Sequence, residues 1–119
     1  MKAVDLKDRT KQFALQTIRF CESLPKDDTS KTIGRQLLRS GTSVAANYRA
    51  VCRSKSTPDF LSKFAIVLEE ADESAFWIEL LVEAGKMSRS KAEPLLKEAN
   101  ELVAISAASL NTARRNARS

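Results

Sequence analysis

Histidine is absent from this sequence of 119 residues, and cysteine occurs only twice. Without histidine, the chain cannot complete the histidine-containing ligand sets of zinc or di-iron sites, and it lacks a neutral imidazole for general base catalysis. Cys21 and Cys52 fit no metal-ligand spacing, so we expect both to be small core or edge residues. The sequence therefore indicates no metal site and no cofactor.

Long apolar runs are also missing, and the chain begins with the charged stretch MKAVDLKDRT. A helix that spans a bilayer needs roughly 20 consecutive apolar residues, and a signal peptide has an apolar centre. We therefore expect a cytoplasmic protein without a membrane partner. Its length fits a single domain with one core.

Glycine and proline are scarce, with three of each, and they fall where helices should begin, end or pack closely. Apolar residues recur at three- and four-residue spacing, which is typical of amphipathic helices. Four helices are predicted: residues 5–23, a second from an N-cap at Asp28 or Thr29 to Arg53, a third from a cap at Ser56 or Thr57 to Gly85, and a fourth from a Ser90–Glu93 capping box onward. Short connections between long helices predict an all-α, antiparallel, up-down-up-down four-helix bundle.

The bundle domain is expected to cover residues 1–113. The remaining residues, 114–119, contain three arginines and are predicted to form a basic, flexible C-terminal tail.

Charge is unevenly distributed along the chain. Residues 26–55 carry seven cations and two anions, whereas residues 56–85 carry one cation and seven anions. Such asymmetry suggests an ordered assembly or an anionic partner.

The second predicted helix has three different faces. Its core face carries the apolar residues Ile33, Leu37, Val44, Tyr48 and Val51. A stripe of small and polar residues lies beside it, consisting of Gln36, Ser40, Ser43 and Asn47. Together with Gly41, this stripe would allow another helix to approach closely.

Basic residues occupy the third face of this helix: Lys31, Arg35, Arg49 and Arg53. At 1.5 Å per residue they would form a stripe about 33 Å long, which could follow the phosphates of a nucleic acid with help from Arg114 and Arg115. A plain solvated face and ion pairing with a neighbouring subunit are the alternatives. No aromatic residues are interleaved, which argues against specific recognition of single strands.

The third predicted helix is apolar on two sides. Its core face is complete for a bundle, yet Ile66, Trp77 and Leu81 are placed on the opposite side, around Glu70 and Glu73. A clustered apolar patch that contains tryptophan is characteristic of a contact surface. We therefore predict an oligomer or partner interface there, with a wider intramolecular core as the alternative.

The carboxylates in the stretch EEADE could suggest acid-base or metal chemistry. Pairing of Glu70 and Glu73 with an arginine, such as Arg39, is the more economical explanation. No nucleophile is placed beside a base and no glycine-rich loop is present, so the chain is not expected to be an enzyme.

The stretches QLLRSGTSVAANYR and PDFLSKFAIVLEEADESAFWIELL resemble the four-helix-bundle proteins encoded in intervening sequences of bacterial 23S rRNA genes. The resemblance covers residues 10–113 and is specific in the pattern of Arg39, Ser40, Thr42, Ser43 and Asn47, and again in Glu70, Glu73 and Trp77. It implies a cytosolic bacterial bundle, with members that form homopentamers. It is also similar to the accessory proteins of diversity-generating retroelements, which bind nucleic acid and a reverse transcriptase. No enzyme activity is implied.

One residue departs from the family pattern. Members often carry Glu shortly after the asparagine, where this sequence has Ala50. Arg49 or Arg53 would then have one acidic partner fewer. Two hypotheses follow: an oligomer, with a pentamer favoured, whose basic surface binds RNA or DNA, or a structural or protein-binding scaffold without nucleic acid.

Overall fold

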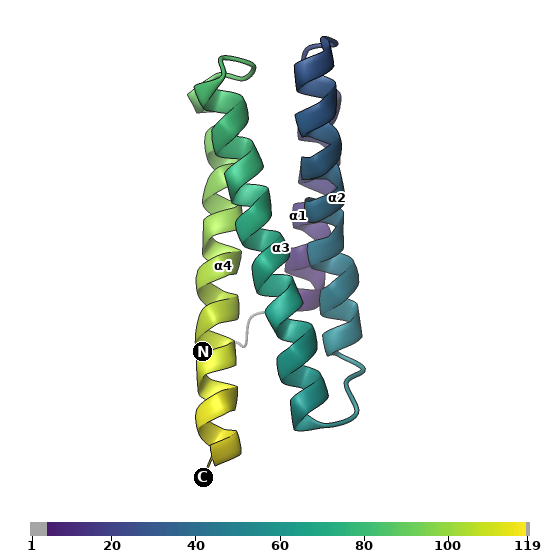
Figure 1. Cartoon of the computed structure of the whole chain (residues 1–119), viewed down its shortest axis with the longest axis vertical. Coiled ribbons are helices and arrows are strands. Elements are labelled where there is room, and N and C mark those ends of the chain that lie inside the picture. Colours follow the sequence, from purple (N-terminus) through teal and green to yellow (C-terminus); the bar gives the residue numbers. More distant parts are fainter. Residues whose placement is uncertain (1–4, 119) are drawn as a thin grey trace.

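Four helices make up the computed structural model, which describes residues 5–118 (Figure 1). They are α1 (Leu6–Glu22), α2 (Asp28–Val51), α3 (Thr57–Glu83) and α4 (Arg89–Arg118). Consecutive helices run antiparallel and are joined by short connections (Figure 1). The predicted all-α four-helix bundle is confirmed.

The four helices do not pack equally closely. The helix α3 lies against both α2 and α4, and α1 packs closely on α2 but only sparsely on α4. The bundle measures 51 × 26 × 21 Å. Because α1 has 17 residues and α4 has 30, α4 extends well past the start of α1.

Side-chain caps define where α2 and α3 begin. The backbone N–H of Ser30 donates to Asp27 at 3.0 Å, so α2 is capped by Asp27, one residue before the predicted Asp28. The backbone N–H of Asp59 donates to Ser56 at 3.2 Å, which confirms Ser56 as the cap of α3. Each cap satisfies a backbone donor that has no partner inside its helix.

The end of α3 was also predicted correctly. Gly85 has a φ of +75°, in the left-handed region that favours glycine. The N–H of Gly85 donates to the carbonyl of Val82 at 3.0 Å, and the N–H of Lys86 donates to Leu81 at 2.9 Å. These two bonds form a Schellman motif, which satisfies carbonyl groups at the end of the helix.

The boundaries of α4 differ from the prediction at both ends. The helix is capped by Ser88, whose Oγ accepts the N–H of Lys91 at 3.3 Å, instead of by the Ser90–Glu93 box. At the other end α4 continues through Arg118, so residues 114–118 of the predicted tail are helical; Ser119 lies outside the described residues. No glycine or proline follows Pro94, and the segment is rich in alanine and arginine, both strong helix formers.

The core runs the length of the bundle and receives side chains from every helix. Its fully enclosed residues include Phe13, Leu37, Ile78 and Leu102. A polar contact lies among them, because the hydroxyls of Ser40 in α2 and Ser74 in α3 are 2.8 Å apart and both residues are buried. Across residues 5–118, every buried side-chain polar atom has a hydrogen-bond partner.

The predicted close approach of α2 to another helix occurs at Gly41. A Cβ placed on Gly41 would lie 2.6 Å from Cγ2 and 2.7 Å from Oγ1 of Thr17 in α1. The Thr17 hydroxyl donates to the carbonyl of Phe13 at 2.8 Å, which fixes its rotamer. The absence of a side chain at Gly41 therefore sets the spacing between α1 and α2.

Candidate nucleic-acid interface

A basic groove lies between the first turns of α1 and the end of α2. Its lining is made of Lys7, Lys11, Ala45, Ala46, Arg49 and Arg53, and its volume is about 590 Å³. The cations come from both helices, while the two alanines contribute only methyl groups. Both walls of the groove therefore carry positive charge, and the rest of its lining consists of small apolar side chains.

The four cations of this groove have no ion-pair partner in the part of the chain that the structure describes. Within residues 5–118, no carboxylate lies in salt-bridge range of Lys7, Lys11, Arg49 or Arg53. Ala50, next to Arg49 in the sequence, offers no carboxylate to these cations. Their charge is available to an external anion.

Other cations of the bundle are paired within the chain. Arg9 of α1 donates to Glu98 of α4 through Nε at 2.7 Å and through Nη2 at 2.8 Å, and Nη2 also lies 3.6 Å from Glu101. The hydrogen bond to Glu98 raises the pKa of Arg9. A bidentate pair of this kind joins α1 to α4 at the seam where they otherwise contact sparsely.

The other half of the predicted basic stripe lies at the opposite end of α2. Lys31 and Arg35 line a smaller hollow of about 210 Å³. Arg35 and Arg49 are 14 residues apart, or about 21 Å along the helix. Leu38 and Thr42 lie between them, so the basic residues form two separate clusters and not one continuous stripe.

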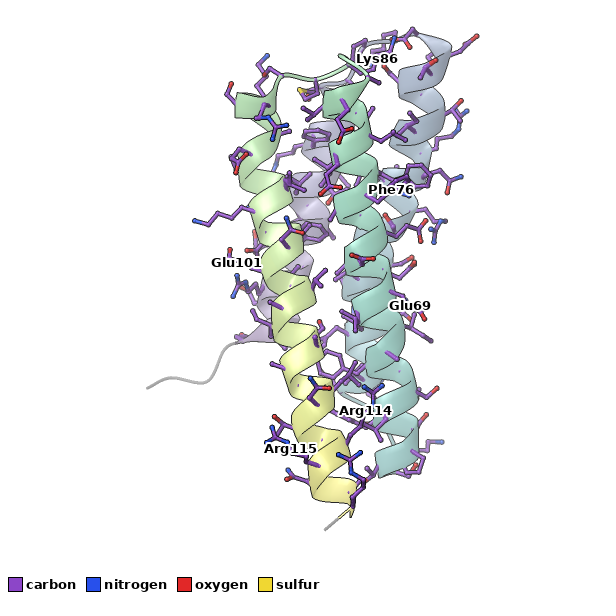
Figure 2. The ribbon with its side chains drawn as sticks, turned by 60° about the vertical axis from the view of Figure 1, so that its left-hand side comes forward. Glu69, Phe76, Lys86, Glu101, Arg114 and Arg115 are labelled. Atoms are coloured by element: carbon purple, nitrogen blue, oxygen red, sulfur yellow. The ribbon has the colours of Figure 1, made fainter. Side chains whose placement is uncertain are left out.

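Arg114 and Arg115 are placed on the last turns of α4 (Figure 2). They are not part of the groove. Glu101 of α4 contacts Arg9 of α1, so the two residues lie at the same height in the bundle. Arg114 is 13 residues further along α4 than Glu101, a distance of about 20 Å. The six basic residues predicted from the sequence thus lie in three places.

Sequence analysis did not identify Lys7 and Lys11 as part of the site. They are spaced four residues apart on α1, which places them on one face of the helix, but nothing local indicates which part of α2 they face. Only the packing of α1 on α2 brings them to Arg49 and Arg53.

Polar residues at the seam between α2 and α3 form one cluster, as predicted for Arg39. Arg39 donates to Glu70 at 3.0 Å and also to Glu73, and Trp77 Nε1 donates to Glu73 at 3.1 Å. Burial opposes ionisation of Glu73, but the hydrogen bonds from Arg39 and Trp77 outweigh it, and the pKa of Glu73 is lowered. Glu70 and Glu73 therefore have partners within their own chain.

Two further residues of the polar stripe contact other parts of α2. The side-chain amide of Asn47 donates to the carbonyl of Ser43 at 2.8 Å. With the Ser40–Ser74 contact, the side chains of Ser40 and Asn47 therefore have hydrogen-bond partners inside the subunit.

The interface predicted on α3 requires one correction. Leu81 is 0% exposed and belongs to the core of its own bundle, so it cannot contact another subunit. At 100° per residue it lies about 20° from buried Ser74, and α3 packs on two neighbours, which widens its buried arc. Trp77 is half-buried and packs partly against the same core.

The exposed apolar residues of α3 are Ile66, at 41% exposure, and Phe76, at 51%. Phe76 was not predicted, although it is the most exposed large apolar side chain of the described chain. Its ring contacts Trp77 edge-on, with centroids 5.0 Å apart, and it projects from α3 on the side of the bundle shown in Figure 2. Four acidic residues without ion-pair partners in residues 5–118 share this helix: Glu69, Asp72, Glu79 and Glu83.

The described residues offer no metal site. Residues 5–118 contain no group of three or more Cys, Asp or Glu side chains arranged to hold an ion. In the same range, no helix is long and apolar enough to cross a membrane.

Comparison with known proteins gives a family and a structural relative. The family model described as 23S rRNA-intervening sequence protein matches residues 2–108. The chain is also similar to the crystal structure of a protein of unknown function from the S23 ribosomal protein family of Bacteroides thetaiotaomicron. The two are 30% identical, with a TM-score of 0.82 over 88% of this chain and 97% of the other. No curated protein matches the chain.

Proposed function

The chain belongs to the 23S rRNA-intervening sequence protein family, and from this membership we propose that it is a cytoplasmic, non-enzymatic, oligomeric bundle that binds the phosphate backbone of RNA or DNA. The observation that carries the proposal is the groove between α1 and α2, with four cations that have no partner within residues 5–118. Lysine and arginine bind phosphates by releasing counterions, whatever the base sequence.

Assembly is the second part of the proposal. Ile66 and Phe76 expose apolar surface on α3, the helix that also carries Glu69, Asp72, Glu79 and Glu83, which have no ion-pair partner within residues 5–118. Exposed large apolar side chains, aromatic ones in particular, favour contact with another subunit. A homopentamer is the form that the family resemblance favours.

The alternative is a scaffold that binds only protein. The acidic face of α3 and the basic groove have opposite charge, so α3 of one subunit could lie over the groove of the next. The groove would then be closed to nucleic acid, and the charges would set subunit register and partner choice.

Fluorescence anisotropy with a labelled RNA and a labelled DNA tests the proposal. The Arg49→Glu/Arg53→Glu variant should bind more weakly, and removal of two phosphate contacts should lower the slope of log K against log salt by about 2. The matched control is Lys31→Glu/Arg35→Glu, which makes the same charge change on the same helix, about 21 Å away. Equal binding by wild type and both variants, or no binding by the wild type, would refute the proposal in favour of the scaffold.

A further inference from the structure

We infer that the groove binds double-stranded nucleic acid in preference to single strands, and that it does so without regard to base sequence or sugar. This inference rests on the proposed function and specifies its ligand. The inference follows from the positions of the four cations, from the small size of the two other lining residues, and from the absence of aromatic, amide and hydroxyl side chains in the lining.

The cations are arranged in two pairs, one on each wall. Lys7 and Lys11 are one helical turn apart on α1, about 6 Å, and Arg49 and Arg53 are spaced by four residues on the opposite wall. Packed helices have axes 8–10 Å apart as a rule. A sugar-phosphate strand lying in the groove can therefore be contacted from both sides. The length of one turn of the protein helix corresponds to about two phosphates of that strand.

The lining of the groove offers no aromatic ring on which a base can stack. Ala45 and Ala46 contribute methyl groups, and no aromatic residue lines the groove. The nearest aromatic side chain in the sequence, Tyr48, packs edge-on against Phe64 of α3, with ring centroids 5.7 Å apart. Proteins that bind single strands rely on stacking of bases on aromatic rings for much of their affinity, so an unpaired strand would lack that contribution here.

The lining also lacks groups that could read bases or sugars. No amide or hydroxyl side chain is present among the six residues. Base edges are read by such groups or by bidentate arginines inside a base-pair groove, and the ribose 2′-hydroxyl by a donor or acceptor at its position. Phosphates are then the only features left to recognise.

A duplex meets these conditions better than a single strand. Its bases are already stacked on each other and face away from the protein, so the groove need not accommodate them. Its phosphates form a regular ridge with a higher charge density, and neutralising each of them releases more counterions than in a single strand. The ridge is also fixed in shape before binding, which lowers the entropic cost of association.

Competition anisotropy on the full chain tests the inference. The probes are an RNA duplex and a DNA duplex of about 16 base pairs, a duplex of scrambled sequence, and unstructured oligouridine and oligothymidine with the same number of phosphates. Both duplexes and the scrambled one should bind within about threefold of each other, and the single strands about tenfold more weakly. Lys7→Glu/Lys11→Glu should weaken duplex binding as much as Arg49→Glu/Arg53→Glu, because each removes one wall.

A gain-of-function variant provides an independent readout. Ala46 is exposed and lines the groove, so Ala46→Trp adds an aromatic ring to the lining. Single strands should then bind more tightly relative to duplexes. Single strands that bind wild type as tightly as duplexes, or RNA and DNA duplexes that differ by more than about tenfold, would overturn the inference and leave the proposed function intact. Absence of binding to every probe would overturn both.

Discussion

The close contact of α1 and α2 at Gly41 predicts the effect of adding a single methyl group. Replacing glycine by alanine inside a helix favours folding by about 1 kcal/mol through helix propensity. At Gly41 the new Cβ would lie 2.6 Å from Cγ2 and 2.7 Å from Oγ1 of Thr17, which is fully buried and held by its bond to Phe13. Overpacking of this kind costs about 1–3 kcal/mol, so Gly41→Ala should destabilise the chain by up to about 2 kcal/mol net.

Gly34→Ala is a matched control on the same helix. There the new Cβ would lie 3.0 Å from Cδ1 of Leu24 only, a terminal methyl group that can move. Helix propensity should then dominate, and the variant should be as stable as the wild type or more so, by up to about 1 kcal/mol.

Urea unfolding followed by circular dichroism, at one fixed protein concentration because assembly would contribute to stability, measures both variants. Thr17→Ala removes the two closest atoms, so it should recover part of the loss in the double variant with Gly41→Ala. If Gly41→Ala proved as stable as Gly34→Ala, the spacing of α1 and α2 would not be set by this contact.

Two further predictions concern α3 and the start of α2. Phe76→Asp should leave the helical content unchanged and lower the mass of the assembly in light scattering, because Phe76 is 51% exposed and its removal spares the core; an unchanged mass would place the interface elsewhere. Asp27 has its pKa lowered from 3.8 to about 2, first by the backbone N–H and then by the hydroxyl of Ser30. A depressed pKa in the folded state stabilises the fold above the unfolded value, and this contribution is lost as pH falls from about 4 to about 2. Asp27→Ala should therefore unfold at lower urea than the wild type at neutral pH, and the two should converge at about pH 2; a difference that persists there would contradict the cap.

Much of the fold could be predicted from the sequence because local signals agreed with each other. Apolar spacing gave the four helices, and Ser56 was one of the two caps expected for α3. Gly85 was correct because glycine is the residue that best suits a left-handed backbone. The caps of α2 and α4 were misplaced by one or two residues. In each case two neighbouring residues of equal capping ability compete, and only the backbone conformation decides between them.

The site was harder to predict because it depends on how helices pack. Leu81 was assigned to the outside of α3 on the assumption of one buried stripe, whereas α3 is covered by two neighbours. Lys7 and Lys11 join Arg49 and Arg53 only through the register of α1 on α2. Ion pairing of Arg39 with Glu70 and Glu73 was predictable, since complementary charges lay on adjacent helices.

The sparse packing of α1 on α4 has a consequence for how the bundle opens. A helix held mainly by one neighbour and by the Arg9–Glu98 pair is the first candidate for detachment in native-state hydrogen exchange. Its departure would take Lys7 and Lys11 away and leave the groove with a single wall. A ligand that contacts both walls would therefore hold α1 against α2. It should slow hydrogen exchange of the α1 amides more than that of the α3 amides.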